Sequence, residues 1–404
     1  MSIALAFSGG LDTSFCVPYL RETYDEPVFT VTVNTGGLGP GEAEAIEARA
    51  HELGAAGHVL LDGRQALYDD LLDYLVKGNV LRGHVYPLCV GPERVVQARL
   101  AVEYARQVGA RAVAHGSTGA GNDQVRFDVA LRMLGEGLDI LAPIRALNLS
   151  RADSTAYLRE RGYAVPDKTT AYSINQGLWG TTIGGTETHT TAQPLPDEAY
   201  PTTTSPAEAP DQPLELSIGF EQGTPRTLDG GALDPVALIE ALNELGGRHG
   251  IGRAIHVGDT ILGIKGRVGF EAPAALLLIQ AHRELEKLVL TKWQSYQKSQ
   301  LGDLYGMLLH EGQYFDPVMR DIEAFLDSSQ QVVTGTVRLR LFKGQAQVLG
   351  ATSAYSLFDT GTATYGEGNA LWDGRDAEGF TKIYGLQGQL ARAARQQDTP
   401  ASSA

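Results

Sequence analysis

The stretch IALAFSGGLDTSF, residues 3–15, decides the fold. Its first five residues form a short apolar run that predicts a buried strand, and residues 13–21 predict a helix. Glycines in the intervening turn let backbone N–H groups approach a ligand, and the N-terminus of the following helix adds a positive dipole. We therefore expect a strand–loop–helix phosphate site at the start of the chain.

The expected phosphate loop carries hydroxyl groups and one carboxylate. Ser8, Thr13 and Ser14 supply hydroxyl donors for phosphate oxygens. Asp12 would repel phosphate unless a Mg²⁺ ion lies between the two. The loop lacks the Gly-Lys-Ser/Thr ending of a Walker loop and the spacing of a dinucleotide fingerprint. The pattern indicates ATP with Mg²⁺, and the alternative is a plain glycine-rich turn with a serine cap.

Strand and helix patterns continue to alternate up to about residue 165. Strands are expected at 28–33, 58–61, 111–115 and 139–143, and helices at 42–53, 65–77, 93–108 and from the Ser150/Asp153 capping box to Gly162. Repeated strand–helix units of this length indicate an α/β fold with a doubly wound parallel sheet. Ligands of such sheets bind at the carboxyl ends of the strands.

The rest of the chain has a mixed α+β character. Residues 188–213 are rich in Thr, Pro and Ala, and we expect an extended surface crossing or a partner-contacting arm outside the core. Further elements are expected at 214–220 (strand), 235–248 and 274–300 (helices), 332–351 (a hairpin turning near Lys343-Gly344) and 386–396 (a short helix). The predicted parts are an ATP-binding domain (1–165), an α+β domain (166–384), which the family resemblance given below implies to be a synthetase and oligomerisation domain, and a C-terminal helix and tail (385–404).

Composition narrows the class of protein. The 404 residues include 33 Lys+Arg and 48 Asp+Glu, and a net charge of −15 disfavours nucleic acid as a partner. There is no apolar run long enough for a membrane span, and the N-terminus lacks the cationic start of a signal peptide. Cys16 and Cys89 show no metal or redox spacing. We expect a cytoplasmic protein without a membrane partner.

A second motif, HGSTGAGNDQVRF, follows the strand expected at 111–115. Its small residues permit close approach of a ligand, and Arg126 can bind a carboxylate through two parallel hydrogen bonds. Thr118, Asn122 and Asp123 offer donors and an acceptor suited to an amino acid. The alternative is a surface loop in which Asn-Asp caps a helix.

Both motifs resemble those of known enzymes. The first resembles the ATP loop of argininosuccinate synthases, GMP, asparagine and NAD synthetases and tRNA thiolases, which all cleave ATP to AMP and pyrophosphate. The second resembles the H-G-x-T-G-K-G-N-D-Q-V-R-F signature of argininosuccinate synthases. Similar matches recur along nearly the whole chain, at residues 172–175, 247–253, 263–267, 343–344 and 376–380. The chain is similar to the argininosuccinate synthase family.

The resemblance implies a two-step ligation, as in arginine biosynthesis, by a homotetramer. The ureido oxygen of citrulline attacks the α-phosphorus of MgATP, and the amine of aspartate then displaces AMP from citrullyl-AMP. Asp12, Asp123 and Arg126 are the implied catalytic residues, with Asp12 also near Mg²⁺. The implied ATP site is Ala6, Phe7, Ser8, Gly9, Gly10, Leu11, Asp12, Thr13, Ser14, Val33 and Gly116. Aspartate is assigned to Thr118, Asn122 and Asp123, and citrulline to Tyr86, Asn122, Arg126, Ser173 and Thr182.

The chain departs from the family pattern at the citrulline site. Arg94 matches the arginine of the family's T-S-x-A-R-P run, but Val90-Gly91 replaces the Thr-Ser pair of that run. Farther along the chain, Gly258 replaces a glutamate and Phe270 replaces a tyrosine. A buried ammonium without its partners is unfavourable, so the departures favour a blocked amine, such as an N-acylated citrulline. Gly91 and Gly258 would make room for the acyl group. The alternative is ordinary citrulline, recognised by neighbours such as Asp259.

Two other functions stay open as alternatives. A tRNA thiolase would need a nucleophilic cysteine pair and a basic surface, and a nucleotide sensor would not need the amino-acid shell at 118–126. The histidines at 51, 84, 189, 249 and 310 are interpreted as structural or surface residues. His115 is interpreted as orienting backbone, and Trp179 as either pocket wall or core.

Overall fold

The fold is described from a computed structural model, which covers residues 1–165, 172–358 and 371–397. By their contacts, residues 1–355 form one compact unit and residues 356–404 form a second. The predicted domain boundary at residue 165 adjoins residues outside the described ranges and stays a prediction.

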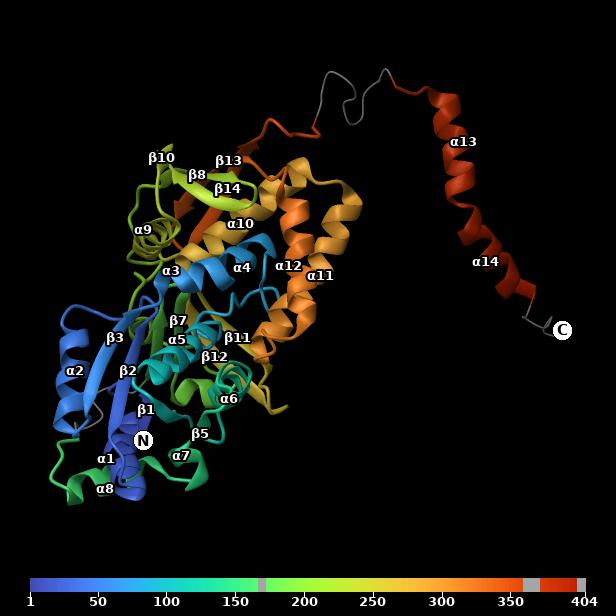
Figure 1. The fold of residues 1–404 in the computed structure, drawn as a ribbon. Helices are drawn as coiled ribbons and strands as arrows, with labels where there is room; N and C mark the ends of the chain where they lie inside the picture. The colour runs from blue at the N-terminus through green and yellow to red at the C-terminus, as the bar shows by residue number, and fades with distance from the viewer. Residues whose placement is uncertain (166–171, 359–370, 398–404) are drawn as a thin grey trace, which may run out of the picture. The chain divides into compact units, whose positions relative to one another are not determined.

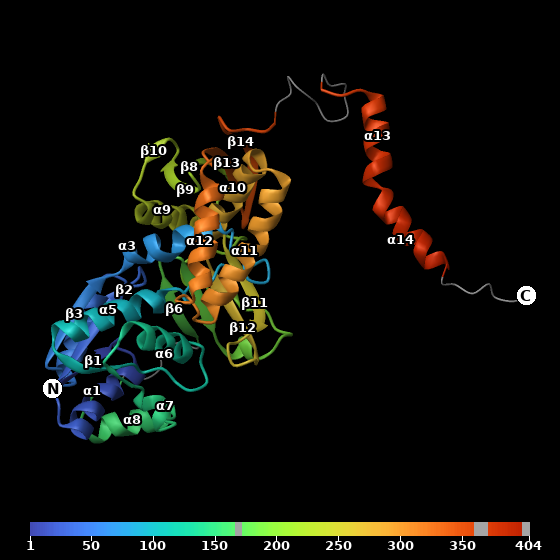
Figure 2. The same cartoon turned by 45° about the vertical axis from the view of Figure 1, so that its right-hand side comes forward.

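A five-stranded parallel sheet lies at the N-terminal end of the first unit (Figures 1 and 2). Its strand order is β3 (Gly57–Asp62), β2 (Val28–Asn34), β1 (Ser2–Ala6), β4 (Ala110–Ala114) and β5 (Asp139–Leu141). Every pair of neighbours is parallel. The chain moves outward from β1 to one edge and then returns to β4 on the other side. The predicted doubly wound parallel sheet is therefore confirmed.

Helices cover both faces of this sheet. They are α1 (Leu11–Tyr24), α2 (Glu42–Glu52), α5 (Glu93–Gln107), α6 (Asp123–Leu134), α7 (Pro143–Ala146) and α8 (Arg151–Glu160). Phe15 and Leu20 of α1 pack with Leu158 of α8 in one core, and Val102 of α5 packs with Leu131 of α6 in another. The predicted capping box of α8 is present, since Ser150 Oγ accepts the Asp153 N–H at 3.2 Å.

The helix predicted at 65–77 is helical throughout, but it widens in the middle. It consists of α3 (Arg64–Leu67), a π-helical turn η1 (Tyr68–Leu72) and α4 (Asp73–Lys77). Its apolar side chains Leu67, Leu71 and Leu75 belong to the large core of the second half of the chain. This segment therefore joins the first sheet to the rest of the unit.

Two antiparallel sheets follow. One has the order β11 (Arg253–Asp259), β12 (Lys265–Glu271), β7 (Gly180–Gly184) and β6 (Ser173–Gly177). The other has the order β10 (Gly231–Ala232), β9 (Thr224–Leu228), β8 (Leu214–Glu221), β13 (Gly335–Phe342) and β14 (Gln345–Thr352). The predicted hairpin turn is confirmed: Lys343 and Gly344 have φ of 44° and 82°, as a two-residue turn with both central residues left-handed requires.

The helices of this half are α9 (Pro235–Arg248), α10 (Pro273–Val289), α11 (Lys292–His310) and α12 (Pro317–Gln330). The single helix predicted at 274–300 was wrong, because the chain breaks between α10 and α11. Leu290 is extended, and the Thr291 hydroxyl accepts the Gln294 N–H at 3.4 Å to begin α11. The break contains neither Gly nor Pro, the residues that most often mark the end of a helix, so the sequence pattern did not indicate it.

The crossing at 188–213 was also predicted only in part. It contains the short 3-10 helices η2 (Thr186–His189) and η3 (Asp197–Ala199). Leu195 and Ala199 are buried with Ile183 in a small core, and the Thr203 N–H donates to the Glu271 carboxylate at 2.9 Å. The segment is therefore fastened to the sheet of β12, and its exclusion from the core was wrong.

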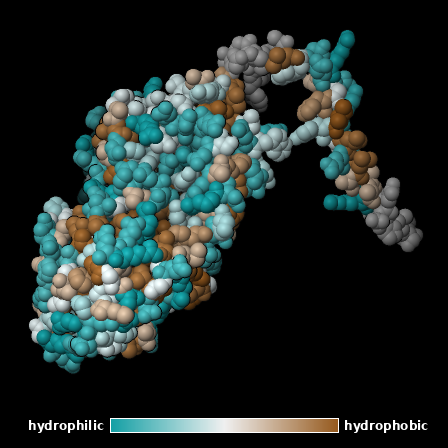
Figure 3. All heavy atoms as spheres, viewed as in Figure 1, coloured by the Kyte–Doolittle hydropathy of each residue, from teal (hydrophilic) through white to brown (hydrophobic). Residues whose placement is uncertain are grey.

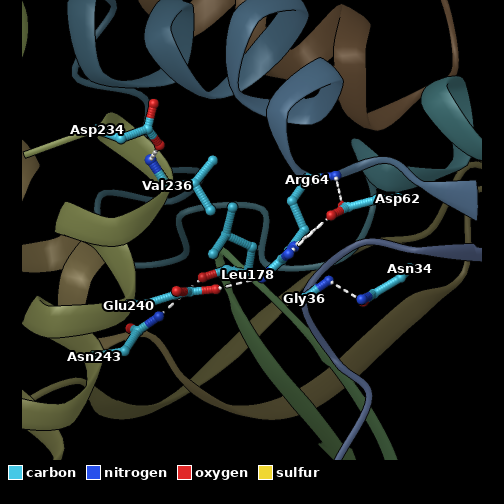
Figure 4. Close-up of polar contacts among 9 residues, drawn as sticks. All are labelled: Asn34, Gly36, Asp62, Arg64, Leu178, Asp234, Val236, Glu240 and Asn243. Carbon is cyan, nitrogen blue, oxygen red and sulfur yellow. Dashed lines mark hydrogen bonds and ion pairs between the residues drawn. The ribbon is translucent and has the colours of Figure 1, made fainter. Parts of the chain in front are cut away.

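A polar junction connects the first sheet with α9 (Figure 4). Arg64 pairs with both Asp62 and Glu240, at 2.8 and 3.0 Å. The Leu178 carbonyl accepts from the Asn243 side chain at 2.9 Å, and the Leu178 N–H donates to the Thr35 carbonyl at 2.8 Å. The β6–β7 turn is thereby held beside the carboxyl end of β2.

The second unit contains α13 (Gly374–Tyr384) and α14 (Leu386–Gln397), so the predicted terminal helix is confirmed. Both helices expose large hydrophobic side chains, including Phe380, Ile383, Tyr384 and Leu390. Brown, hydrophobic atoms lie along this unit in Figure 3. Among the described residues, no helix has both the length and the apolar character needed to cross a membrane.

Candidate active site

A cavity of about 890 Å³ lies where β1 and β4 end side by side. Residues of both glycine-rich turns line it, together with residues of β6, β7, β11 and β12. This is the point at which the strand order reverses in the sheet, where ligands of such folds bind. The predicted convergence of the two motifs on one cleft is confirmed.

The two turns touch through Gly116. A β-carbon at position 116 would lie 2.9 Å from Thr13 Cγ2 and 3.1 Å from the Thr13 backbone nitrogen. Only glycine permits this approach without movement of the phosphate loop.

The phosphate loop is held in place by its own hydrogen bonds. Thr13 Oγ1 donates to the Gly10 carbonyl at 3.2 Å and accepts the Ser8 N–H at 3.3 Å. Gly9 has a left-handed φ of 72°, and Ser14 is buried behind the loop, where its hydroxyl donates to the Gly9 carbonyl at 3.3 Å. Of the residues assigned to ATP, Gly9 and Ser14 do not line the cavity; the others do: Ala6, Phe7, Ser8, Gly10, Leu11, Asp12, Thr13, Val33 and Gly116.

Asp12 is the carboxylate of the loop that faces the cavity. Burial raises its pKa above the ordinary value, and the charge of Arg151 opposes that rise. No group of three or more His, Cys, Asp or Glu side chains that could hold a metal ion occurs in the described ranges. A Mg²⁺ ion therefore fits here only if it is shared between Asp12 and phosphate oxygens, which are the hard ligands it prefers.

Asp123, at the start of α6, lies between two arginines. Its carboxylate accepts from Arg94 Nε and from Arg126 Nη1, both at 3.0 Å. Burial alone would raise the pKa of Asp123, but the Arg94 and Arg126 guanidiniums outweigh burial and hold that pKa below its usual range. The carboxylate stays ionised at neutral pH.

Arg126 is 8% exposed and is fixed from its other side by His310. Its Nε donates to the His310 carbonyl at 3.0 Å, and its Nη2 lies 3.1 Å from His310 Nδ1. One N–H on each terminal nitrogen remains for a ligand. The predicted carboxylate-binding geometry is therefore still available to Arg126.

His310 lines the cavity, and it holds Arg126 in place there through its carbonyl and its ring. Burial, with the Arg126 and Arg82 charges, lowers its pKa to about 3, so the ring is neutral. Arginine can only donate, so Nδ1 accepts and the proton resides on Nε2. That nitrogen is buried and has no hydrogen-bond partner in the described part of the chain.

The end of the cavity that departs from the family pattern is built on Tyr86. Its ring stacks on His256 with centroids 5.3 Å apart and contacts Phe270 at 5.2 Å. A β-carbon at Gly258 would lie 2.4 Å from His256 Nε2, so the imidazole takes up space beside this glycine. His256 lines the cavity and was missed, because a lone histidine inside a strand pattern carries no sequence signal.

The remaining assigned substrate residues fall into two groups. Thr118, Asn122 and Thr182 line the cavity, and Asn122 Oδ1 also accepts the Ile261 N–H at 2.9 Å. Ser173 is exposed at the start of β6 and does not line the cavity, although Asn175 of the same strand does.

Glu93 is a second residue that sequence reasoning missed. It is 2% exposed, it lines the cavity, and its Oε1 has no hydrogen-bond partner among the described residues. Burial raises its pKa to about 8, against the opposing charge of Arg94. A β-carbon at Gly177 would lie 1.6 Å from Glu93 Oε1, so the carboxyl fills the space of a side chain at position 177.

The structure shows the roles of two residues that the sequence left open. His115 Nδ1 accepts the Ser117 N–H at 3.3 Å and its Nε2 lies 2.9 Å from Asp128, so His115 orients the second turn as predicted. Trp179 is fully buried, donates to the Pro87 carbonyl at 2.8 Å and belongs to the core.

Known proteins are similar to this chain along most of its length. The sequence model described as "Arginosuccinate synthase N-terminal HUP domain" matches residues 2–164, and "Arginosuccinate synthase C-terminal domain" matches residues 172–391. An argininosuccinate synthase of Synechococcus sp. (strain JA-3-3Ab) is 43% identical over 387 residues, 95% of each chain. One of Methanocaldococcus jannaschii is 39% identical over 386 residues, 96% of each chain. One of Rubrobacter xylanophilus is 41% identical over 387 residues, 95% of this chain and 93% of the relative.

Proposed function

Because this chain belongs to the argininosuccinate synthase family, we propose that it joins citrulline or an N-acylated citrulline to aspartate while ATP is split to AMP and pyrophosphate. The family membership makes it an ATP-dependent ligase. The observation that carries the proposal is the meeting of the phosphate loop and the 115–126 turn in one cavity. A triphosphate and two amino-acid-like molecules need such a shared space.

In the first step, the ureido oxygen forms a bond to the α-phosphorus, and the bond to the β-phosphate breaks to release pyrophosphate. The protein positions the reactants and balances their charge, which dominates phosphoryl transfer. Ser8, Thr13 and the loop N–H groups would hold phosphate oxygens. Mg²⁺ shared with Asp12 would neutralise part of the phosphate charge when it is bound.

In the second step, the amine of aspartate forms a bond to the ureido carbon, and the bond from that carbon to the AMP oxygen breaks. Thr118, Asn122 and Asp123 would hold aspartate. Asp123 is ionised, so it can accept from the aspartate amine while Arg94 and Arg126 keep its position. Tyr86, Thr182 and Arg126 would hold the ureido compound.

The two alternatives find less support. Cys16 and Cys89 are both buried, and burial raises the pKa of each thiol, which opposes the nucleophilic role that a thiolase would need. A nucleotide sensor would bind ATP without turnover.

The test is pyrophosphate release from ATP with aspartate held constant and a panel of ureido compounds added. Release that requires both aspartate and a ureido compound supports the ligase. If ATP binds but no ureido compound supports release, the ligase proposal fails.

The predicted homotetramer is also a proposal. The exposed apolar side chains of α13 and α14 would gain by docking on another surface, since short helices are marginal when isolated. Light scattering of the full chain, compared with a chain ending at residue 372, tests it. A monomeric full chain would exclude the tetramer.

A further inference from the structure

We propose that the blocked amine of the ureido substrate carries an acyl group that itself ends in a carboxylate, received by Arg82 and His256 beside Gly258. This inference rests on the proposed function and names the substrate class within it. It follows from the charge, the room and the unpaired groups at one end of the cavity.

Two side-chain nitrogens pack against Gly258. A β-carbon there would lie 2.4 Å from His256 Nε2 and 3.3 Å from Arg82 Nη1. A substrate group that reaches this end of the cavity therefore meets an imidazole and a guanidinium. Both residues line the cavity.

The charge at this end of the cavity is positive. Arg82 donates to the Asp259 carbonyl at 2.6 Å, but it forms no ion pair with a carboxylate in the described residues. The Asp259 carboxylate is engaged by Lys265 at 2.6 Å. Arg126 has Asp123 as its partner, but Arg94 shares that carboxylate. A free ammonium would therefore meet excess positive charge, whereas a carboxylate would be attracted.

Hydrogen bonding at this end is incomplete. His256 is 7% exposed, and its Nε2 has no hydrogen-bond partner in the described chain; the same holds for Nε2 of His310. Buried polar groups are normally hydrogen-bonded, so each unpaired nitrogen is a candidate for a ligand contact. With its proton on Nε2, His256 would donate to a carboxylate oxygen.

The room for an acyl chain is the cavity itself, about 890 Å³, which Arg82, Tyr86 and His256 line at this end. At Gly91, a β-carbon would lie 3.3 Å from Arg126 Cζ, so the guanidinium packs closely against this glycine. Gly83 packs in the same way against the His256 ring, since a β-carbon there would be 3.0 Å from Cε1. A neutral acyl group, such as acetyl, would fill this space but leave the Arg82 charge without a partner.

The test compares kcat/KM for citrulline, N-acetylcitrulline and N-succinylcitrulline with the full chain, ATP and aspartate. N-succinylcitrulline is expected to exceed both others by at least about tenfold, the effect of one good charge pair. Arg82→Gln is expected to lower kcat/KM for N-succinylcitrulline about ten times more than for N-acetylcitrulline. Arg338→Gln is the matched control, because it removes an exposed guanidinium that does not line the cavity, and it should leave the preference unchanged.

A second variant keeps the inference testable if Arg82→Gln does not fold. His256→Ala combined with Gly258→Glu places a carboxylate in the same space and should shift the preference toward free citrulline. Equal or better activity of wild type with citrulline or N-acetylcitrulline would overturn the inference while leaving the ligase intact. Absence of pyrophosphate release with all three compounds would instead overturn the proposed function.

Discussion

Gly116 lies against Thr13 so closely that a β-carbon at position 116 would stand 2.9 Å from Thr13 Cγ2. The contact exists because β1 and β4 are neighbours in the sheet, so the turns that follow them meet at its edge. It joins the loop proposed for ATP to the turn proposed for aspartate.

Gly116→Ala should therefore disturb the phosphate loop. We expect KM for ATP to rise at least about tenfold, since overpacking forces backbone shifts that cost roughly 1–3 kcal/mol. Gly119→Ala is the control, because its β-carbon would have only an ordinary contact, 3.6 Å from Arg145 Cγ. Steady-state pyrophosphate release measures both, and equal KM values in the two variants would refute the role of the contact.

Asp123→Asn should impair both stability and catalysis. The substitution removes the carboxylate that pairs with Arg94 and Arg126, and leaving buried charges uncompensated costs about 3–5 kcal/mol. We expect a lower unfolding temperature and a fall of roughly 100-fold in kcat/KM for aspartate. Asp139→Asn, which removes an exposed partner of Arg111, should change kcat/KM by less than about twofold and the free energy of unfolding by less than about 1 kcal/mol.

Much of the first sheet could be predicted because each strand is a short apolar run that ends in turn residues. Local pattern could not predict the break at Leu290-Thr291, where tertiary packing and a threonine cap end one helix and begin the next. Nor could it assign Leu195 to a core, since the surrounding Thr- and Pro-rich composition is typical of surface.

The residues of the site also could be predicted only in part from the sequence. The two turns are continuous motifs with recognisable chemistry, so their residues could be named in advance. Arg82, Glu93, His256 and His310 come from separate segments, and they meet only because the antiparallel sheet of β12 and the end of α11 pack against the first sheet's edge. No local spacing encodes that approach.

Glu93 should make stability depend on pH. Its folded-state pKa is about 8 against an ordinary value of 4.5, so the folded chain keeps a proton that the unfolded chain releases. Protonated Glu93 therefore lets the folded state keep its full stability below about pH 4.5, and that stability is lost progressively as pH rises toward 8. The Glu93→Gln variant has no group that titrates at this position. Its free energy of unfolding relative to that of the wild type should therefore increase from pH 5 to pH 9, by up to a few kcal/mol. Urea unfolding at both pH values measures the gain, and a constant difference would contradict the assignment.

Gly177→Ala should be destabilising unless position 93 is shortened. Its β-carbon would coincide with Glu93 Oε1, at 1.6 Å. We expect a loss of roughly 1–3 kcal/mol for the single variant and recovery of much of it in Gly177→Ala with Glu93→Ala. Thermal unfolding of the two single variants and the double variant gives the coupling, and strict additivity would show that the residues do not compete for space.

Replacement of both cysteines should leave the reaction intact. Cys16 and Cys89 are buried and free, and neither is needed for the proposed ligation. Cys16→Ala with Cys89→Ala is expected to keep kcat within about threefold and to lose roughly 1–2 kcal/mol of stability. Loss of turnover in the folded double variant would reopen the thiolase alternative.

The packing of Glu93 against Gly177 also constrains the order in which these positions can change over evolutionary time. With a small residue at 93, position 177 can accept either glycine or a larger residue, whereas with glutamate at 93 a β-carbon at 177 requires the carboxyl to move. Replacement of Gly177 by a larger residue is therefore expected to be easier once the side chain at position 93 has been shortened.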